Sequence, residues 1–90
     1  MISQNTAQKI SNVCNQMESC NLAINLIKEE LASAGKPEVF INVAKNLRDG
    51  GITVALVPET AEVILYKQLE VLRDEYKELN ELAAEELKAT

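Results

Sequence analysis

Apolar residues recur at alternating steps of three and four along residues 10–34, the spacing that lets one side of a helix pack along another helix. The positions in this series are Ile10, Val13, Met17, Cys20, Ile24, Ile27, Leu31 and Ala34. Gly35 suits a residue just past a helix end, and Pro37 prevents the helix from continuing. The pattern predicts a long helix over about residues 4–34.

A second series with the same spacing lies in the last third of the chain. Its members are Leu65, Leu69, Leu72, Tyr76, Leu79 and Ala83. Pro58 fits the first position of a helix, and Glu59 behind it favours the positive end of the helix dipole. This predicts a second helix over about residues 58–88. At 1.5 Å per residue each helix is about 45 Å long, so we expect the two to form an antiparallel hairpin.

The segment between these helices is less regular. Helical spacing over residues 37–48 predicts a short helix, whose apolar positions are Phe40, Val43, Ala44 and Leu47. Residues 51–57 are β-branched and apolar, so they form either an extended connector packed on the helices or a strand that pairs with its own copy in a dimer. The connector is favoured because no second strand-like run is found in the chain.

Together these elements predict a single all-α domain: an antiparallel hairpin of two long helices joined by a short helix and an extended connector. A hairpin buries only one side of each helix, and apolar residues remain on the other sides. Those assigned to an oligomer interface are Leu22, Leu26, Ile64 and Val71. Exposed apolar surface on this scale marks an interface, so we expect a homo-oligomer, most simply a symmetric dimer that forms a four-helix bundle.

Charge and cysteine content indicate which partners and which cellular compartment to expect. The 90 residues carry 14 acidic and 9 basic side chains, a net charge of −5, and the excess acid lies after residue 58. Such a balance disfavours direct nucleic-acid binding, which needs clustered Lys and Arg. Cys14 and Cys20 lie on different sides of one helix and cannot bridge each other. Without a disulfide pattern, a secretory signal or a membrane-spanning apolar run, the expected location is the cytoplasm.

Residue content also argues against catalysis. The chain has no His, which excludes His-based acid/base and nucleophile pairs and His-ligated metals. Gly50-Gly51 matches neither a dinucleotide nor a P-loop spacing. Neighbouring carboxylates such as Glu85 and Glu86 point about 100° apart on a helix and do not converge. We therefore expect no enzyme, no cofactor and no metal site.

Two polar surfaces are candidates for contact with a partner. The exposed side of the first helix is rich in amides and hydroxyls rather than charges, and its central residues are Asn12, Asn15 and Ser19. Asn is a poor helix former, so its repeated use calls for an explanation beyond solvation. The second helix carries an acidic set of Asp74, Glu78 and Glu81. The leading hypothesis is a small binding or regulatory protein that acts stoichiometrically on another protein as an inhibitor, adaptor or assembly factor, in the style of phage and plasmid accessory proteins.

An alternative of another class rests on the basic residues of the middle segment. Lys36, Lys45 and Arg48 are its cations, and a symmetric oligomer would multiply them. Such a cluster could hold phosphate groups. The alternative function is therefore an oligomeric sponge that sequesters a small phosphate-bearing nucleotide between subunits.

Overall fold

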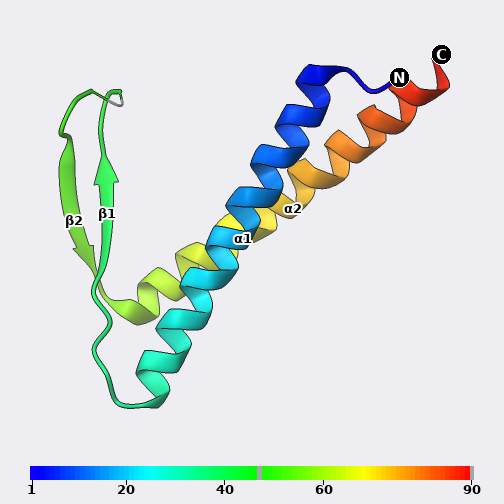
Figure 1. Ribbon diagram of the computed structural model, residues 1–90. Helices are drawn as coiled ribbons and strands as arrows, with labels where there is room; N and C mark the ends of the chain where they lie inside the picture. Colours follow the sequence, from blue (N-terminus) through cyan, green and yellow to red (C-terminus); the bar gives the residue numbers. More distant parts are fainter. Residues whose placement is uncertain (47, 90) are drawn as a thin grey trace.

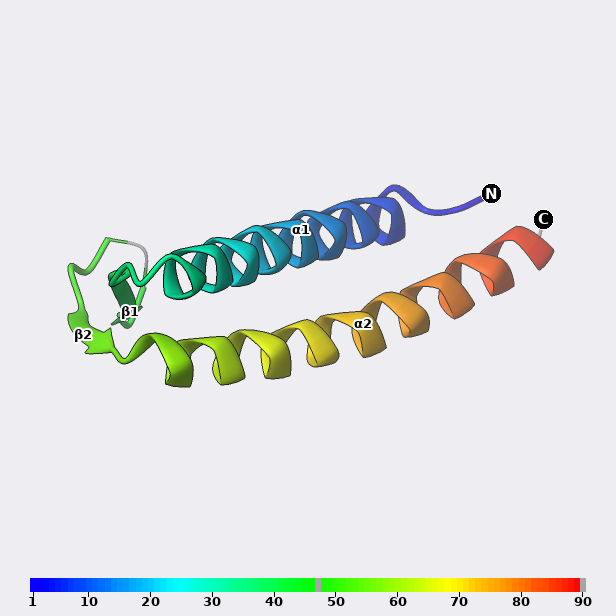
Figure 2. The same ribbon diagram turned by 90° about the horizontal axis from the view of Figure 1, so that it is seen from below.

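The computed structural model describes residues 1–46 and 48–89 and contains two long helices and one β-hairpin. Helix α1 (Gln4–Ala32) leads into strand β1 (Val39–Val43), which is followed by strand β2 (Ile52–Leu56) and helix α2 (Pro58–Lys88). The helices run antiparallel and side by side, with both chain ends at the same end of the pair (Figures 1 and 2). The β-hairpin stands away from the other end of the pair, so the chain has the outline of a V (Figure 1).

The core of the molecule lies along the line where α1 and α2 meet. Its buried residues are Val13, Cys20, Ile24, Leu69, Leu72 and Leu79, flanked by the half-buried Ile10, Met17, Leu65 and Tyr76. These are the apolar positions at steps of three and four, which fall on one side of an α-helix because 3.6 residues make a turn. Lys28 adds a surface contact between the helices, with its Nζ 5.0 Å from the centre of the Tyr66 ring.

Helix α1 begins in a hydrogen-bonded cluster that joins both ends of the chain. Ser3 is the N-cap, and its Oγ accepts from the backbone N–H of Thr6 at 3.1 Å. The Glu86 carboxylate, from the last turns of α2, accepts from the Ser3 backbone N–H at 3.0 Å and from the Thr6 hydroxyl at 2.8 Å. These contacts satisfy N–H groups that a helix start leaves without partners. They also explain how the Thr6 side chain is buried without an unpaired hydroxyl.

Helix α1 ends in a Schellman motif. Gly35 N–H donates to Glu30 O at 2.7 Å, and Ala34 N–H donates to Leu31 O at 3.2 Å, the pair of bonds that defines this end. The residue in the left-handed conformation is Ala34, with φ 59°. Gly35, expected just past the helix end, lies one position later.

The middle of the chain overturns the all-α prediction. Residues 39–43 form β1 rather than part of a short helix, and they pair antiparallel with β2. The spacing of Phe40, Val43 and Ala44 fits a helix, but Val39, Ile41 and Val43 also alternate, and three β-branched residues in five favour a strand. Most of the connector assigned to residues 51–57 is likewise strand β2 (Ile52–Leu56), and it pairs within its own chain. Leu47, the last apolar position of the expected helix, lies outside the described residues.

The turn between the strands is built from side-chain hydrogen bonds. Asn46 Oδ1 accepts from the backbone N–H groups of Arg48 and Asp49 at 2.9 and 3.0 Å, the pattern by which Asn and Asp stabilise turns. Gly51 has φ 68°, and a Cβ there would lie 2.5 Å from Val43 O, so this position requires glycine. The Asp-Gly-Gly sequence thus closes a hairpin rather than ending a helix.

Candidate binding surface

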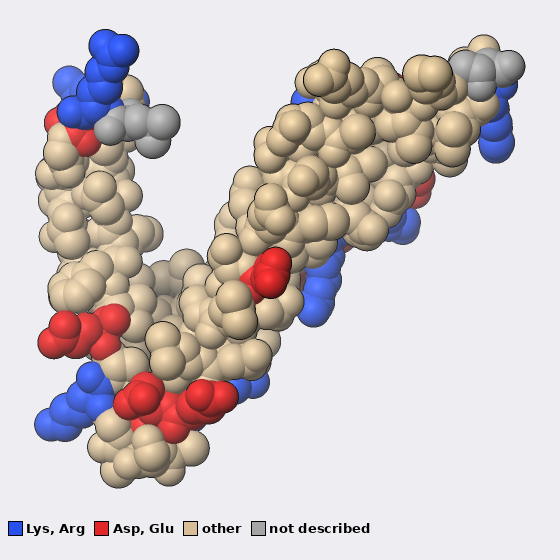
Figure 3. All heavy atoms as spheres, viewed as in Figure 1, with Lys and Arg blue, Asp and Glu red and all other residues tan. Residues whose placement is uncertain are grey.

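We call strands β1 and β2, with residues 44–46 and 48–51 between them, the arm. The arm projects from the helix pair and diverges from it toward the tip (Figure 3). The radius of gyration is 16.9 Å, against about 12 Å for a compact chain of this length. The shape leaves a hollow between the arm and the helices.

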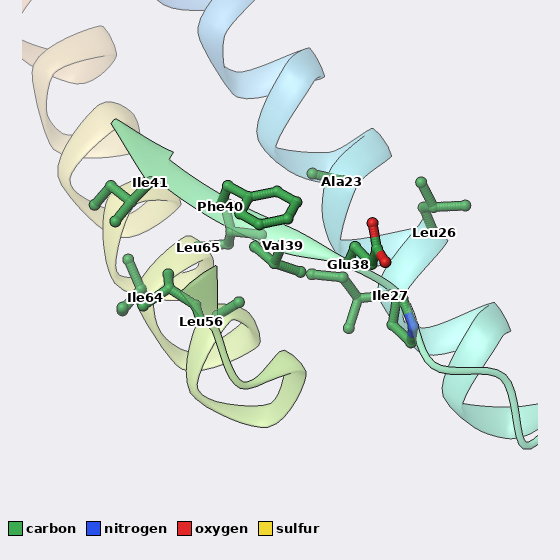
Figure 4. Close-up of a pocket in the computed structure, with 12 residues that line it drawn as sticks. Ala23, Leu26, Ile27, Glu38, Val39, Phe40, Ile41, Leu56, Ile64 and Leu65 are labelled. Carbon is green, nitrogen blue, oxygen red and sulfur yellow. The ribbon is translucent and has the colours of Figure 1, made fainter. Parts of the chain in front are cut away.

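At the base of the arm this hollow becomes an apolar groove of about 400 Å³. Leu26 comes from α1, Ile64 and Leu65 come from α2, and Val39 and Phe40 come from β1, as Figure 4 shows. Phe40 and Ile64 keep 59% and 42% of their surface exposed. The groove therefore offers apolar side chains that nothing in the described chain covers.

Strand register gives the arm two different faces. On one side every residue is aliphatic, because Val39, Ile41 and Val43 lie opposite Leu56, Val54 and Ile52. We call these six residues the aliphatic face. Its four residues toward the tip are 41–71% exposed. The other side carries Phe40, Asn42, Thr53 and Ala55, with the Thr53 hydroxyl donating to Asn42 Oδ1 at 3.3 Å.

A second stripe of exposed residues runs along α1, away from its core side. Its members follow one another at steps of four and three: Gln8, Asn12, Asn15, Ser19, Leu22 and Leu26. That spacing places all six on one side of the helix. We call these residues the second stripe. Its first part is made of amides and a hydroxyl, its last part is leucine, and it carries no charge along its length.

The second stripe adjoins exposed residues of α2. Asn15 and Ser19 share a shallow hollow with Gln68, and Ile64 and Val71 lie on the same side of α2 as Gln68 by helical spacing. Leu26 and Ile64 then meet at the groove. The structure thus brings the predicted partner residues of α1 and the four predicted oligomer residues to one broad side of the helix pair. Their role in an interface remains a prediction.

The acidic set lies elsewhere. Asp74, Glu78 and Glu81 line a hollow with Lys77 on the side of α2 opposite its buried residues, as their spacing from Leu72 and Leu79 requires. All three are exposed. The acidic set and the second stripe are therefore separate surfaces.

The basic residues of the nucleotide hypothesis are also divided. Lys45 and Arg48 lie in the loop at the tip of the arm, with Asp49 beside them, whereas Lys36 precedes β1 at its base. A five-residue strand separates tip and base by about 17 Å. One chain therefore does not gather the three cations, and the sponge would need another subunit to do so.

Few groups on the molecule have a perturbed acidity. The pKa of Glu86 lies below its ordinary value, chiefly because the Ser3 backbone N–H and the Thr6 hydroxyl donate to its carboxylate. The pKa of Lys28 is raised, first by its interaction with the Tyr66 hydroxyl and then by nearby negative charge. Both groups join one helix to the other and lie outside the groove. Over residues 1–46 and 48–89, no three metal-binding side chains come together.

Sequence reasoning missed the arm and its aliphatic face. The available signal was the β-branched residue at every second position of residues 39–43, combined with Asn46 and the Asp-Gly-Gly turn, which together mark a hairpin. The chain matches no known protein-family model, curated protein or solved structure. Within the described residues, neither helix has the length and apolar content that crossing a membrane requires.

Proposed function

We propose that this chain is a non-catalytic binding protein that holds another protein stoichiometrically, through the amide part of the second stripe of α1. The observation that supports the proposal is the continuity of that part: Gln8, Asn12, Asn15 and Ser19 are all exposed and occupy one side of the helix. An inhibitor, adaptor or assembly factor would act in this way.

The chemistry of these side chains suits a protein partner. An amide offers two donors and an acceptor, and its desolvation costs less than that of a full charge. Gln8 donates to Asn12 Oδ1 at 3.0 Å, whereas Asn15 and Ser19 make no side-chain hydrogen bond within the described chain. Their groups are available to a partner.

Helix propensity points the same way. An Asn inside a helix costs several tenths of a kcal/mol relative to Ala. Asn12 recovers part of that cost through its hydrogen bond from Gln8, whereas the exposed Asn15 has no such side-chain contact within the described chain. A solvated surface would be served better by Lys or Glu. Free thiols at Cys14 and Cys20 are compatible with action in a reducing compartment such as the cytoplasm.

The test compares two substitutions of the same kind at different positions around α1. Asn15→Lys changes the second stripe, while Asn25→Lys changes an exposed Asn about 80° or more away around the helix. Tagged protein is used to isolate a stoichiometric partner from the native host, and calorimetry then measures the affinity. We expect Asn15→Lys to weaken binding about tenfold or more, and Asn25→Lys to leave it unchanged. Equal effects, or no stoichiometric partner at all, would contradict the proposal.

The acidic set provides a second, independent comparison. Charge neutralisation by Asp74→Asn, Glu78→Gln and Glu81→Gln removes three negative charges from the outer side of α2. If this surface contacts the partner, binding of the wild-type protein should weaken with added salt and the neutralised variant should lose that dependence. If only the second stripe binds, the salt dependence should be the same for both.

A further inference from the structure

We propose that two copies of the chain clasp each other, with the arm of each copy lying in the hollow between the arm and the helix pair of the other. One face of each arm then packs against the other arm, and the opposite face packs against the second copy's helices. The partner is a second copy of this chain, and the proposal does not depend on the function proposed above.

The amount of exposed surface supports a dimer. The chain exposes 6966 Å², whereas a compact monomer of 9.9 kDa exposes about 5,200 Å². The excess is roughly 1,800 Å², and one subunit of an obligate homodimer contributes about 1,000–2,500 Å² to its interface. The surplus surface is therefore the amount that such a dimer would bury.

The arm has little to stabilise it within a single copy of the chain. An isolated two-stranded hairpin is marginal in water, and this one meets the helix pair mainly at its base, where Val39 and Leu56 are half-buried. Toward the tip, Val43 and Ile52 are 63% and 71% exposed. Both strands also have an edge without a pairing strand among residues 1–46 and 48–89. The arm needs a cover whenever the protein is folded, and a second copy is the partner that is always present at synthesis.

The aliphatic face of the arm matches its own copy, and the helices offer apolar residues to the opposite face. The aliphatic face has no polar side chain, so it packs on its own image around a two-fold axis without leaving a buried polar group. Across the groove, Leu26 and Ile64 offer uncharged apolar contacts, 57% and 42% exposed. The acidic set lies on the outer side of α2, away from the groove, whereas Glu38 is an acidic residue that lines the groove at the base of the arm.

A matched pair of valine substitutions tests the clasp. Val54→Lys puts a charge on the aliphatic face, and Val63→Lys puts the same charge on the outer side of α2; the two valines are 47% and 69% exposed. Sedimentation equilibrium of the wild type at micromolar concentration should give twice the 9.9 kDa mass. We expect Val54→Lys to raise the dimer dissociation constant at least about tenfold, and Val63→Lys to leave it unchanged.

Two further measurements test the clasp even if Val54→Lys fails to fold. Circular dichroism reports whether the helices survive in Val54→Lys, whose side chain lies outside the helix core. Separately, benzoylphenylalanine replaces Phe40 in the full chain, and labelled and unlabelled copies are mixed before irradiation. Crosslinks from Phe40 to α1 or α2 of the other copy support the clasp. A monomeric wild type, a dimer that survives Val54→Lys, or crosslinks found only within one chain would overturn it.

Discussion

The helix pair and the arm use similar apolar residues in opposite ways. In the pair, Ile24 and Leu72 are 3% and 2% exposed, whereas Val43 and Ile52 in the arm are 63% and 71% exposed. The pair buries the apolar residues along the line where α1 and α2 meet, whereas the arm leaves its aliphatic face exposed toward the tip. Residue type alone therefore does not decide which apolar positions stabilise this chain, because the decisive difference is whether a second element lies against them.

The comparison assigns stability to the pair and association to the arm. Two long helices with a continuous line of buried contacts stabilise each other through that packing, which does not involve the arm. The arm adds little to that core, since the extensive packing occurs between α1 and α2 and between β1 and β2, and hardly at all between helices and strands.

The largest effect should come from truncating the core. Leu72→Ala removes a side chain that is 2% exposed and leaves a cavity, so we expect the free energy of unfolding to fall by about 2–5 kcal/mol. Ile52→Ala, at 71% exposure, should change it by only about 0.5 kcal/mol in dilute monomer. Urea unfolding measures both. Equal losses in dilute monomer would contradict the division, and a loss at Ile52 that grows with protein concentration would place the arm in an interface.

A smaller effect is expected where the chain leaves the helix pair for the arm. Ala34 has φ 59°, a conformation that is strained for an L-residue and open to glycine. Ala34→Gly should therefore raise the free energy of unfolding by about 0.5–1 kcal/mol. Ala32→Gly is the control, because Ala32 lies in the last turn of α1, where glycine should destabilise by a similar amount. The two changes should shift the thermal midpoint in opposite directions, and shifts of the same sign would contradict the assigned helix end.

Sequence patterning predicted the pair much better than the arm. Apolar residues at steps of three and four recur over many turns of α1 and α2, and only a helix places them all on one side. Residues at those positions, such as Val13, Leu69 and Leu72, are the buried ones. Residues 39–43 offer too few positions to separate a period of 3.6 from a period of two. In a segment that short, the turn decides, and the hydrogen bonds of Asn46 with the left-handed Gly51 close a hairpin.

The candidate surface was predicted only in part. Spacing placed Asn12, Asn15 and Ser19 on one exposed side of α1, because a single helix is enough to define a side. The groove could not be found in this way, since Phe40 reaches Leu26 and Ile64 only once the hairpin has turned the chain back. Lys36 and Lys45 seemed close for the same reason, as a helix would have kept them nearer than a strand does.

The smallest expected effect lies at the far end of the pair, where Glu86 fastens the start of α1. Its folded pKa is lowered by the hydrogen bonds from Ser3 and Thr6, so its contribution to stability is present above the ordinary glutamate pKa of about 4.3. The contribution is lost as the pH falls through the lower folded pKa. Glu86→Gln should therefore lower the thermal midpoint at pH 7 but change it little once the pH lies below the folded pKa of Glu86. Glu85→Gln, at an exposed neighbour, controls for general charge removal. A difference between these two variants that persists unchanged at low pH would mean that the cluster holds the helix ends together by packing, with no contribution from the ionised carboxylate.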